Sequence, residues 1–289
     1  MNLIKLGRQL FPLNRSLTGE GSLKTLKILK KRIPKLKIKK FKSGKKVYDW
    51  KIPKEWNVFD AYVKDKFGKK IIDFKKNNLH LVGYSEPLKK KLNKKELFKH
   101  LHSLKFLPNA IPYITSYYNK YWGFCVTHKR KKLFDKIYSD QDKFDVLINS
   151  KFNKYGNMHY GEIILPGESK KEILVSTYIC HPSMANNELS GPLVAVALIN
   201  YFSKKKLKRT LRFVFAPETI GSIAYINQNL KKLKTNVIGG YVLTCIGDNR
   251  NYSIIKTKYE DSLSDIAARK AFLDLKIKYI SYPFLKRGS

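Results

Sequence analysis

Polar residues follow three neighbouring apolar segments of this sequence, at the point where each segment ends. His181 follows the first segment, Glu218 the second and Asp248 the third. Asn187 and Glu188 stand in the turn between the first segment and a helical pattern. If the segments are parallel strands of one sheet, their carboxyl ends share the edge where ligands bind in open α/β sheets. We therefore expect these five side chains to lie close together.

A histidine and carboxylates that converge at one sheet edge suit a borderline cation such as Zn²⁺. The candidate metal ligands are His181, Asn187, Glu188 and Asp248. Glu218 is the candidate catalytic residue, because a carboxylate beside a bound metal can take a proton from metal-bound water. The pattern thus predicts metal-assisted hydrolysis.

Each of these residues also has an ordinary structural interpretation. A single histidine at a strand end is often hydrogen-bonded without being a ligand. Glu218 could favour the start of the helix that follows it, since carboxylates are stabilised at helix N-termini. Asn187 and Ser190 could be turn and N-cap residues, and Asp248 followed by Asn249 is typical of a turn.

The elements that would position these residues lie in the second half of the chain. From about residue 145, apolar strand patterns alternate with helical patterns at about 191–205, 222–233 and 262–275. Continuous apolar strands that alternate with helices are typical of a mostly parallel sheet covered on both faces. We therefore predict an α/β fold.

The first half of the chain has a different pattern. Residues 21–32 have helical spacing, whereas residues 35–75 form short alternating pieces separated by glycine and proline. This pattern indicates hairpins of a small β-rich unit. Residues 79–121 are rich in aromatic residues and prolines, and we expect them to cover a face instead of forming the centre of a sheet.

The composition is that of a globular protein with a large positive charge. The 289 residues include 59 Lys and Arg against 22 Asp and Glu, a formal net charge of +37. Such a charge can indicate nucleic-acid binding. The excess is almost all lysine and is spread along the chain, and no zinc-finger, RNA-recognition or basic-zipper pattern is present. We therefore expect lysine-rich solvent faces and no specific nucleic-acid partner.

Three further features concern the compartment. No run approaches the roughly 20 apolar residues that a membrane-spanning helix needs. The first 16 residues lack the apolar segment and cleavage site of a secretory signal. The chain has an odd number of cysteines, and they lie far apart and mostly inside apolar runs: Cys125, Cys180 and Cys245. This usage is typical of reduced thiols. We expect a cytoplasmic protein with no membrane span, and the sequence does not indicate its oligomeric state.

Several long motifs resemble one protein family. STYICHPSMANNELSGP and FAPETIGSIAY are similar to bacterial aminopeptidase-like proteins associated with polysaccharide-biosynthesis loci, distant relatives of the co-catalytic zinc aminopeptidases. LFPLNRSLTGEG near the start and AIPYITSYYNKYWGFC in the middle extend the resemblance over essentially the whole chain. It implies a zinc-exopeptidase-like α/β domain (1–46 and 122–289) with a small β-rich domain inserted at 47–121.

The resemblance also assigns roles to single residues. His181 matches the first metal-ligand histidine, and Glu218 matches the glutamate that is the general base or a ligand. Asn187 stands where the zinc peptidases have the aspartate that bridges two metals, and Glu188 could partly compensate for the neutral amide. Asp248 is a candidate substitute for a further aspartate ligand, whose position is near Thr244.

The second metal-ligand histidine of these enzymes comes from a later loop, but this chain has no histidine after His181. We therefore expect the chain to correspond to the N-terminal part of the family's protein. The resemblance implies a zinc-dependent hydrolase of amide or peptide bonds, with one or two zinc ions and a small peptide or amide as substrate. The alternative is a non-catalytic protein whose pocket binds a small molecule or a partner in polysaccharide biosynthesis.

Overall fold

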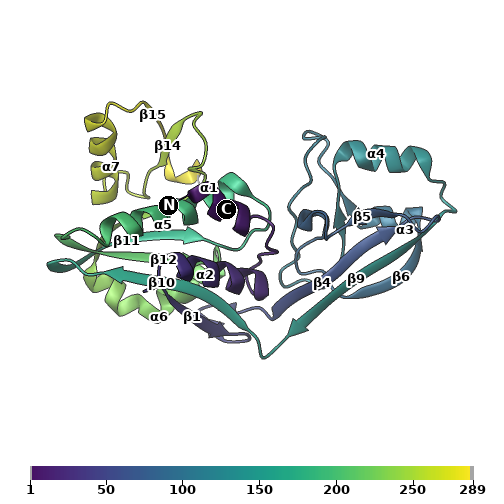
Figure 1. Cartoon of the computed structure of the whole chain (residues 1–289), viewed down its shortest axis with the longest axis horizontal. Helices are drawn as coiled ribbons and strands as arrows, with labels where there is room; N and C mark the ends of the chain where they lie inside the picture. Colours follow the sequence, from purple (N-terminus) through teal and green to yellow (C-terminus); the bar gives the residue numbers. More distant parts are fainter. Residues whose placement is uncertain (1, 287–289) are drawn as a thin grey trace.

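The computed structural model describes residues 2–286 and has two lobes joined by long strands (Figure 1). The first lobe is built on a five-stranded sheet in the order β1-β10-β12-β11-β13. Its strands are β1 (Lys37–Lys42), β10 (Asn157–Leu165), β11 (Ser169–Tyr178), β12 (Arg209–Ala216) and β13 (Val237–Val242).

This sheet is mixed, with β10 antiparallel to its neighbours, so the prediction of a mostly parallel sheet is met only in part. Strand β11 pairs in parallel with β12 and β13, but β10 pairs antiparallel with β1 and β12. Only residues 166–168 connect β10 to β11, and a parallel arrangement of consecutive strands needs a crossover of a dozen or more residues. The short connection therefore reverses the chain direction.

Helices cover both faces of the sheet, as predicted. Helices α1, α2 and α5 share one apolar core with one face of the sheet, and α6 packs in the other core. Helix α5 connects β11 to β12, and α6 connects β12 to β13, so the parallel half is made of βαβ units. The helices are α1 (Leu3–Leu10), α2 (Glu20–Arg32), α5 (Ser190–Phe202) and α6 (Ile220–Asn236).

The second lobe contains a four-stranded antiparallel sheet in the order β5-β4-β9-β6. It takes strands from both sides of residue 121, and the division of the chain into 1–46 with 122–289 and 47–121 stays a prediction. Its elements are β4 (Glu55–Lys64), β5 (Lys70–Asp73), β6 (Leu88–Asn93), α3 (Lys94–Lys99), α4 (His128–Ile137) and β9 (Lys143–Asn153).

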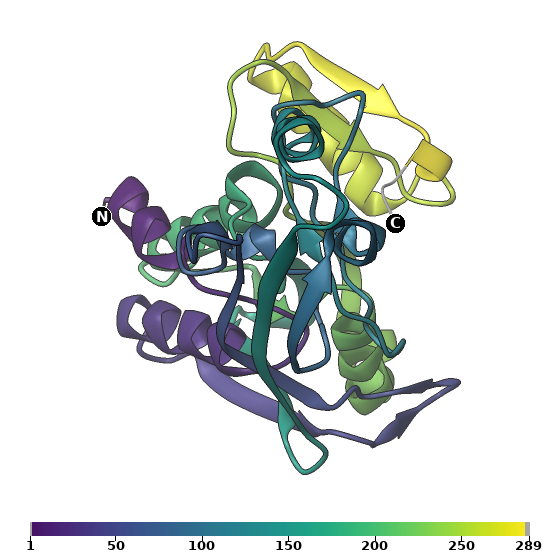
Figure 2. The same ribbon diagram turned by 90° about the vertical axis from the view of Figure 1, so that its right-hand side faces the viewer.

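The C-terminal segment lies beside the edge strand β13. In Figure 2 it is at the top, in yellow, while the N-terminal helices, in purple, are at the left. The hydroxyl of Ser264 accepts a hydrogen bond from the Gly240 N–H at 2.9 Å, which joins this segment to β13. Its elements are β14 (Tyr252–Ile255), α7 (Leu263–Asp274), β15 (Tyr279–Tyr282) and the 3₁₀ turn η3 (Phe284–Lys286).

Short elements complete the chain. Among the described residues, no helix combines the length and apolarity that crossing a bilayer requires. The remaining elements are β2 (Lys46–Val47), β3 (Trp50–Lys51), η1 (Asn78–His80), β7 (Leu101–His102), β8 (Phe124–Cys125) and the π-helical turn η2 (Ala185–Leu189).

Candidate metal and catalytic site

Three adjacent parallel strands end in strained turns at the same sheet edge. Ser183 follows β11, Thr219 follows β12 and Cys245 follows β13, with φ of 46°, 54° and 52°. Residues other than glycine rarely adopt these angles, and each costs of order 1–3 kcal/mol unless the surroundings enforce it. Three of the eight described non-glycine residues with positive φ therefore follow strands that end at this one edge.

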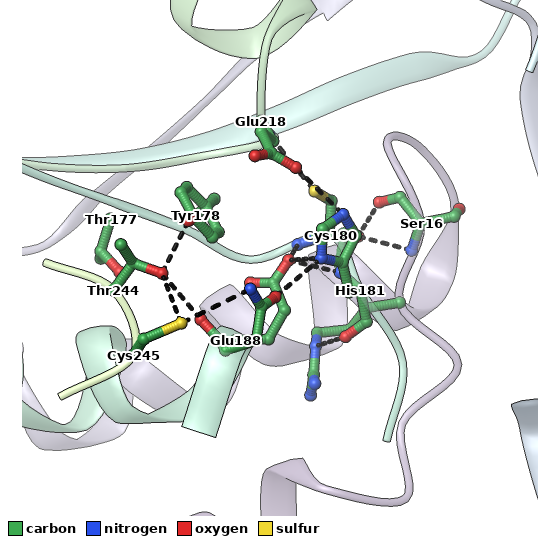
Figure 3. Close-up of polar contacts among 12 residues, drawn as sticks. Ser16, Thr177, Tyr178, Cys180, His181, Glu188, Glu218, Thr244 and Cys245 are labelled. Carbon is green, nitrogen blue, oxygen red and sulfur yellow. Dashed lines mark hydrogen bonds and ion pairs between the residues drawn. The ribbon is translucent and has the colours of Figure 1, made fainter. Parts of the chain in front are cut away.

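His181 lies at this edge between acidic and amide side chains (Figure 3). Its Nε2 is 3.1 Å from Glu218 Oε2, and its Nδ1 is 3.2 Å from Glu188 Oε1 and 3.1 Å from Asn187 Oδ1. Burial by itself lowers the pKa of His181, but the hydrogen bond to Glu218 and the charge of Glu188 raise it above its ordinary value. The predicted convergence of these four residues is therefore present.

Glu188 is fully buried beneath His181. Its Oε1 accepts hydrogen bonds from the backbone N–H groups of Cys180 at 2.9 Å and His181 at 2.6 Å. Its Oε2 has no hydrogen-bond partner among the residues that the structure describes. Burial raises the pKa of Glu188 above its ordinary value. A buried carboxylate oxygen without a partner is costly, and it requires an explanation.

Cys180 lies in the same cluster. The ligand atoms of Cys180, His181 and Glu188 all lie within 4.8 Å of one another, and all three residues are buried. The Cys180 Sγ accepts a hydrogen bond from the Glu218 backbone N–H at 3.2 Å. The sequence predicts Cys180 only as a reduced thiol in an apolar run, and its position directly before His181 is the signal that connects it to this site.

Arg15 fixes the turn from the opposite side, and sequence reasoning missed it. Its side chain is buried, Nε donates to the His181 carbonyl at 2.9 Å, and Nη1 donates to the Leu10 carbonyl at 2.6 Å. The two residues are 166 positions apart in the chain. Arg15 lies in the N-terminal motif LFPLNRSLTGEG, but no spacing along the chain connects this motif to His181.

Two tyrosines form an aromatic wall beside His181. The Tyr113 ring centroid is 4.8 Å from that of His181, and the Tyr178 centroid is 6.2 Å away. Tyr178 donates its hydroxyl hydrogen to Thr244 Oγ1 at 2.6 Å. Tyr113 belongs to the aromatic segment 103–123 of the second lobe. Tyr113 also lies within residues 79–121, which the sequence predicts to cover a face, and its ring lies against His181.

Asp248 is not brought together with the other candidates. Its carboxylate accepts hydrogen bonds from Asn186 Nδ2 at 2.6 Å and Arg250 Nη2 at 2.9 Å. Hydrogen bonding to Arg250 lowers the pKa of Asp248 to about 2. The Asp248 carboxylate is engaged by Asn186 and Arg250, and its role as a metal ligand stays a prediction.

Comparison with known proteins identifies the family of this chain. Residues 4–289 match a family described as a domain of unknown function (DUF4910), and the chain belongs to that family. A Clostridium acetobutylicum protein, named for polysaccharide biosynthesis and an aminopeptidase-like domain, is 43% identical over 288 residues. The match covers 100% of this chain and 64% of that relative. It confirms the resemblance to aminopeptidase-like proteins.

Solved structures show the same fold. A Clostridium acetobutylicum protein named as a peptidase has a TM-score of 0.93 at 43% identity, covering 99% of this chain and 66% of that chain. A zinc aminopeptidase from Bacillus subtilis has a TM-score of 0.63 at 12% identity, covering 97% and 79%. A peptidase M28 precursor from Shewanella amazonensis has a TM-score of 0.65 at 10% identity, covering 99% and 80%. The fold is therefore that of aminopeptidase-like proteins.

Proposed function

We propose that this chain carries the site of a zinc-dependent aminopeptidase-like hydrolase of amide or peptide bonds. His181 and Glu188 hold the metal ion, and Glu218 is the general base. The observation that supports this proposal most is the position of His181, which lies within 3.2 Å of a carboxylate oxygen on each side of its ring. The fold shared with a zinc aminopeptidase from Bacillus subtilis supports the same class of reaction.

The residues at this edge fit a zinc ion. Imidazole nitrogen and carboxylate oxygen are zinc ligands, and catalytic sites have three protein ligands and one open position. The unpartnered Glu188 Oε2 is a buried acceptor that a cation would satisfy. When bound, zinc supplies polarisation of the substrate carbonyl and a lower pKa for its water.

The residues of this chain provide the base and the positioning. Glu218 is partly exposed, with 24% of its side chain accessible, so its carboxylate can meet water and take a proton. Its backbone N–H is fixed on Cys180 Sγ, which holds the start of α6 against the end of β11. The Tyr113 and Tyr178 rings lie beside His181 and provide an apolar surface next to it. A small peptide or amide would be the substrate.

The test combines metal content with hydrolysis of a panel of aminoacyl anilides. We expect wild-type protein to bind zinc, and Glu218→Gln to lose about 10²–10⁴-fold in turnover while it retains the metal. The matched control is Glu168→Gln, which changes an exposed glutamate beside the same sheet and should leave turnover unchanged.

Two outcomes would contradict these roles. Equal turnover in Glu218→Gln and wild type would remove Glu218 as the base. Loss of zinc from a folded Glu218→Gln protein would make Glu218 a metal ligand instead. Absence of stoichiometric zinc from the wild-type protein at neutral pH, after addition of the ion, would overturn the proposal as a whole.

A further inference from the structure

Cys180 is placed like a ligand, although the proposed function assigns it no role. Its Sγ lies within 4.8 Å of the ligand atoms of both His181 and Glu188. In a tetrahedral zinc site the ligand atoms are roughly 3.5 Å apart, because zinc–ligand bonds are about 2.0–2.3 Å long. The three donors therefore need to move together by an ångström or so to surround one ion.

Burial and the charge of Glu188 raise the pKa of the Cys180 thiol well above its ordinary value, so a bound cation would be needed to hold the sulfur as a thiolate. Sγ accepts the Glu218 backbone N–H, one residue before the N-cap of α6. In the described structure the N-cap residue Thr219 makes no side-chain cap at this end of α6. Amide donors and a helix N-terminus stabilise a thiolate.

The second observation is the buried carboxylate beside the thiol. Glu188 is fully buried, its Oε1 already accepts two backbone N–H groups, and its Oε2 has no partner in the part of the chain that the structure describes. The single hydrogen of a thiol cannot satisfy both Glu188 Oε2 and the His181 ring. A divalent cation between the Cys180, His181 and Glu188 side chains would satisfy both. Both observations concern side chains of the same buried group of ligand atoms.

We propose that Cys180 is the third protein ligand of the metal, so that one ion is held by the Cys180 sulfur, the His181 imidazole and the Glu188 carboxylate. This inference rests on the proposed function, because it concerns the same site. Binding replaces the Cys180 S–H bond by a sulfur–metal bond, and the proton passes to the solvent buffer. Three protein donors leave one position open for water, as in catalytic zinc sites.

Cobalt(II) is the probe, since it replaces zinc and reports on its ligands. We expect titration of the whole chain with Co²⁺, under a non-chelating reductant, to produce a near-ultraviolet thiolate-to-cobalt charge-transfer band. Cys180→Ser should lose this band and bind Co²⁺ at least tenfold more weakly. The release of a proton on metal binding, measured by calorimetry in two buffers, should decrease by about one in the same variant.

The matched control is Cys245→Ser. Cys245 is exposed, and its Sγ is 3.8 Å from Asn187 Nδ2, so it is the nearby thiol that could bind cobalt instead. The band should persist in this variant. A band that disappears in Cys245→Ser and persists in Cys180→Ser would overturn the assignment of Cys180.

The outcomes for wild-type protein separate the two proposals, and they do not depend on whether Cys180→Ser folds. Stoichiometric Co²⁺ binding without a charge-transfer band would overturn the cysteine ligand and leave the proposed function standing. No binding of Co²⁺ or Zn²⁺ by equilibrium dialysis would overturn both.

Discussion

Two buried clusters of charged residues lie on the same sheet and differ in how well they are satisfied. In the middle of the sheet, Arg212 pairs with Glu162 at 2.7 Å and Glu172 at 2.5 Å, and Lys39 and Tyr225 complete the hydrogen bonds of Glu162. We call this set the Arg212 network. All four carboxylate oxygens of the network have partners.

The second set lies around His181 at the strand ends, and we call it the His181 cluster. Its hydrogen bonds are less complete than those of the Arg212 network. Glu188 Oε2 and one terminal nitrogen of Arg15 are buried without a hydrogen-bond partner among the described residues. A fully satisfied network stabilises a fold, whereas unpartnered buried groups cost stability and persist where a ligand or a reaction uses them. The comparison indicates a structural role for the Arg212 network and a functional one for the His181 cluster.

The largest expected effect is on stability in the Arg212 network. Arg212→Met leaves buried Glu172 without its cation and Glu162 with Lys39 alone, and we expect a loss of about 3–5 kcal/mol of unfolding free energy. Urea denaturation measures it. A loss below 1 kcal/mol would remove the distinction between the two clusters.

Glu188→Gln should have the opposite effect: stability should change little, and zinc affinity should decrease strongly. The amide oxygen retains the two backbone hydrogen bonds of Oε1, so the unfolding free energy should change by less than about 1 kcal/mol. Zinc affinity should decrease by about a hundredfold or more, because a charged ligand is removed. Unchanged affinity, measured by competition with a chromophoric chelator, would argue against Glu188 as a ligand.

The Arg212 network should also make stability depend on pH. Burial tends to raise the pKa of Glu162, but Lys39, Tyr225 and Arg212 together lower it below its ordinary value near 4.5. A carboxyl group whose pKa is lower in the folded state than in the unfolded state stabilises the fold at pH values above its unfolded-state pKa. This contribution is lost as the pH falls through the folded-state pKa. The urea midpoint should therefore decrease from about pH 5 towards pH 3, and less steeply in Glu162→Gln. Equal slopes in the two proteins would contradict this.

A smaller effect is expected from the aromatic wall. Tyr113→Ala removes the ring beside His181 and should lower zinc affinity by about tenfold, in the range of residues that support metal ligands. Tyr118→Ala is the control, because this exposed tyrosine of the same segment donates to the Lys51 carbonyl. Equal affinities for the two variants would show that Tyr113 does not position His181.

The smallest effect concerns the strained turn before α6. Thr219 is β-branched at φ 54° and makes no side-chain cap in the described structure, so Thr219→Gly should stabilise the protein by about 1 kcal/mol. Turnover should decrease, since the same strain holds Glu218. A thermal melt and a hydrolysis assay check the two parts, and a destabilised Thr219→Gly protein would show that the turn is not strained.

Part of the site could be predicted from the sequence because it depends on local order. Strands of one βαβ unit run in parallel, so residues that follow them meet at one edge, and His181, Glu188 and Glu218 were found in this way. The mixed sheet was not predicted, since an apolar strand pattern does not encode direction. The three-residue connection before β11 was visible, but its consequence required knowledge of which strand pairs with which.

The sequence alone thus determined the residue types and the order of elements that bring His181 and Glu218 together. Only the tertiary structure decided which groups complete the cluster. Arg15 reaches His181 across 166 positions, Tyr113 arrives from the second lobe, and the Cys180 sulfur accepts the Glu218 backbone N–H. These contacts depend on how distant segments pack and on the turn after β11, and no spacing along the chain specifies either.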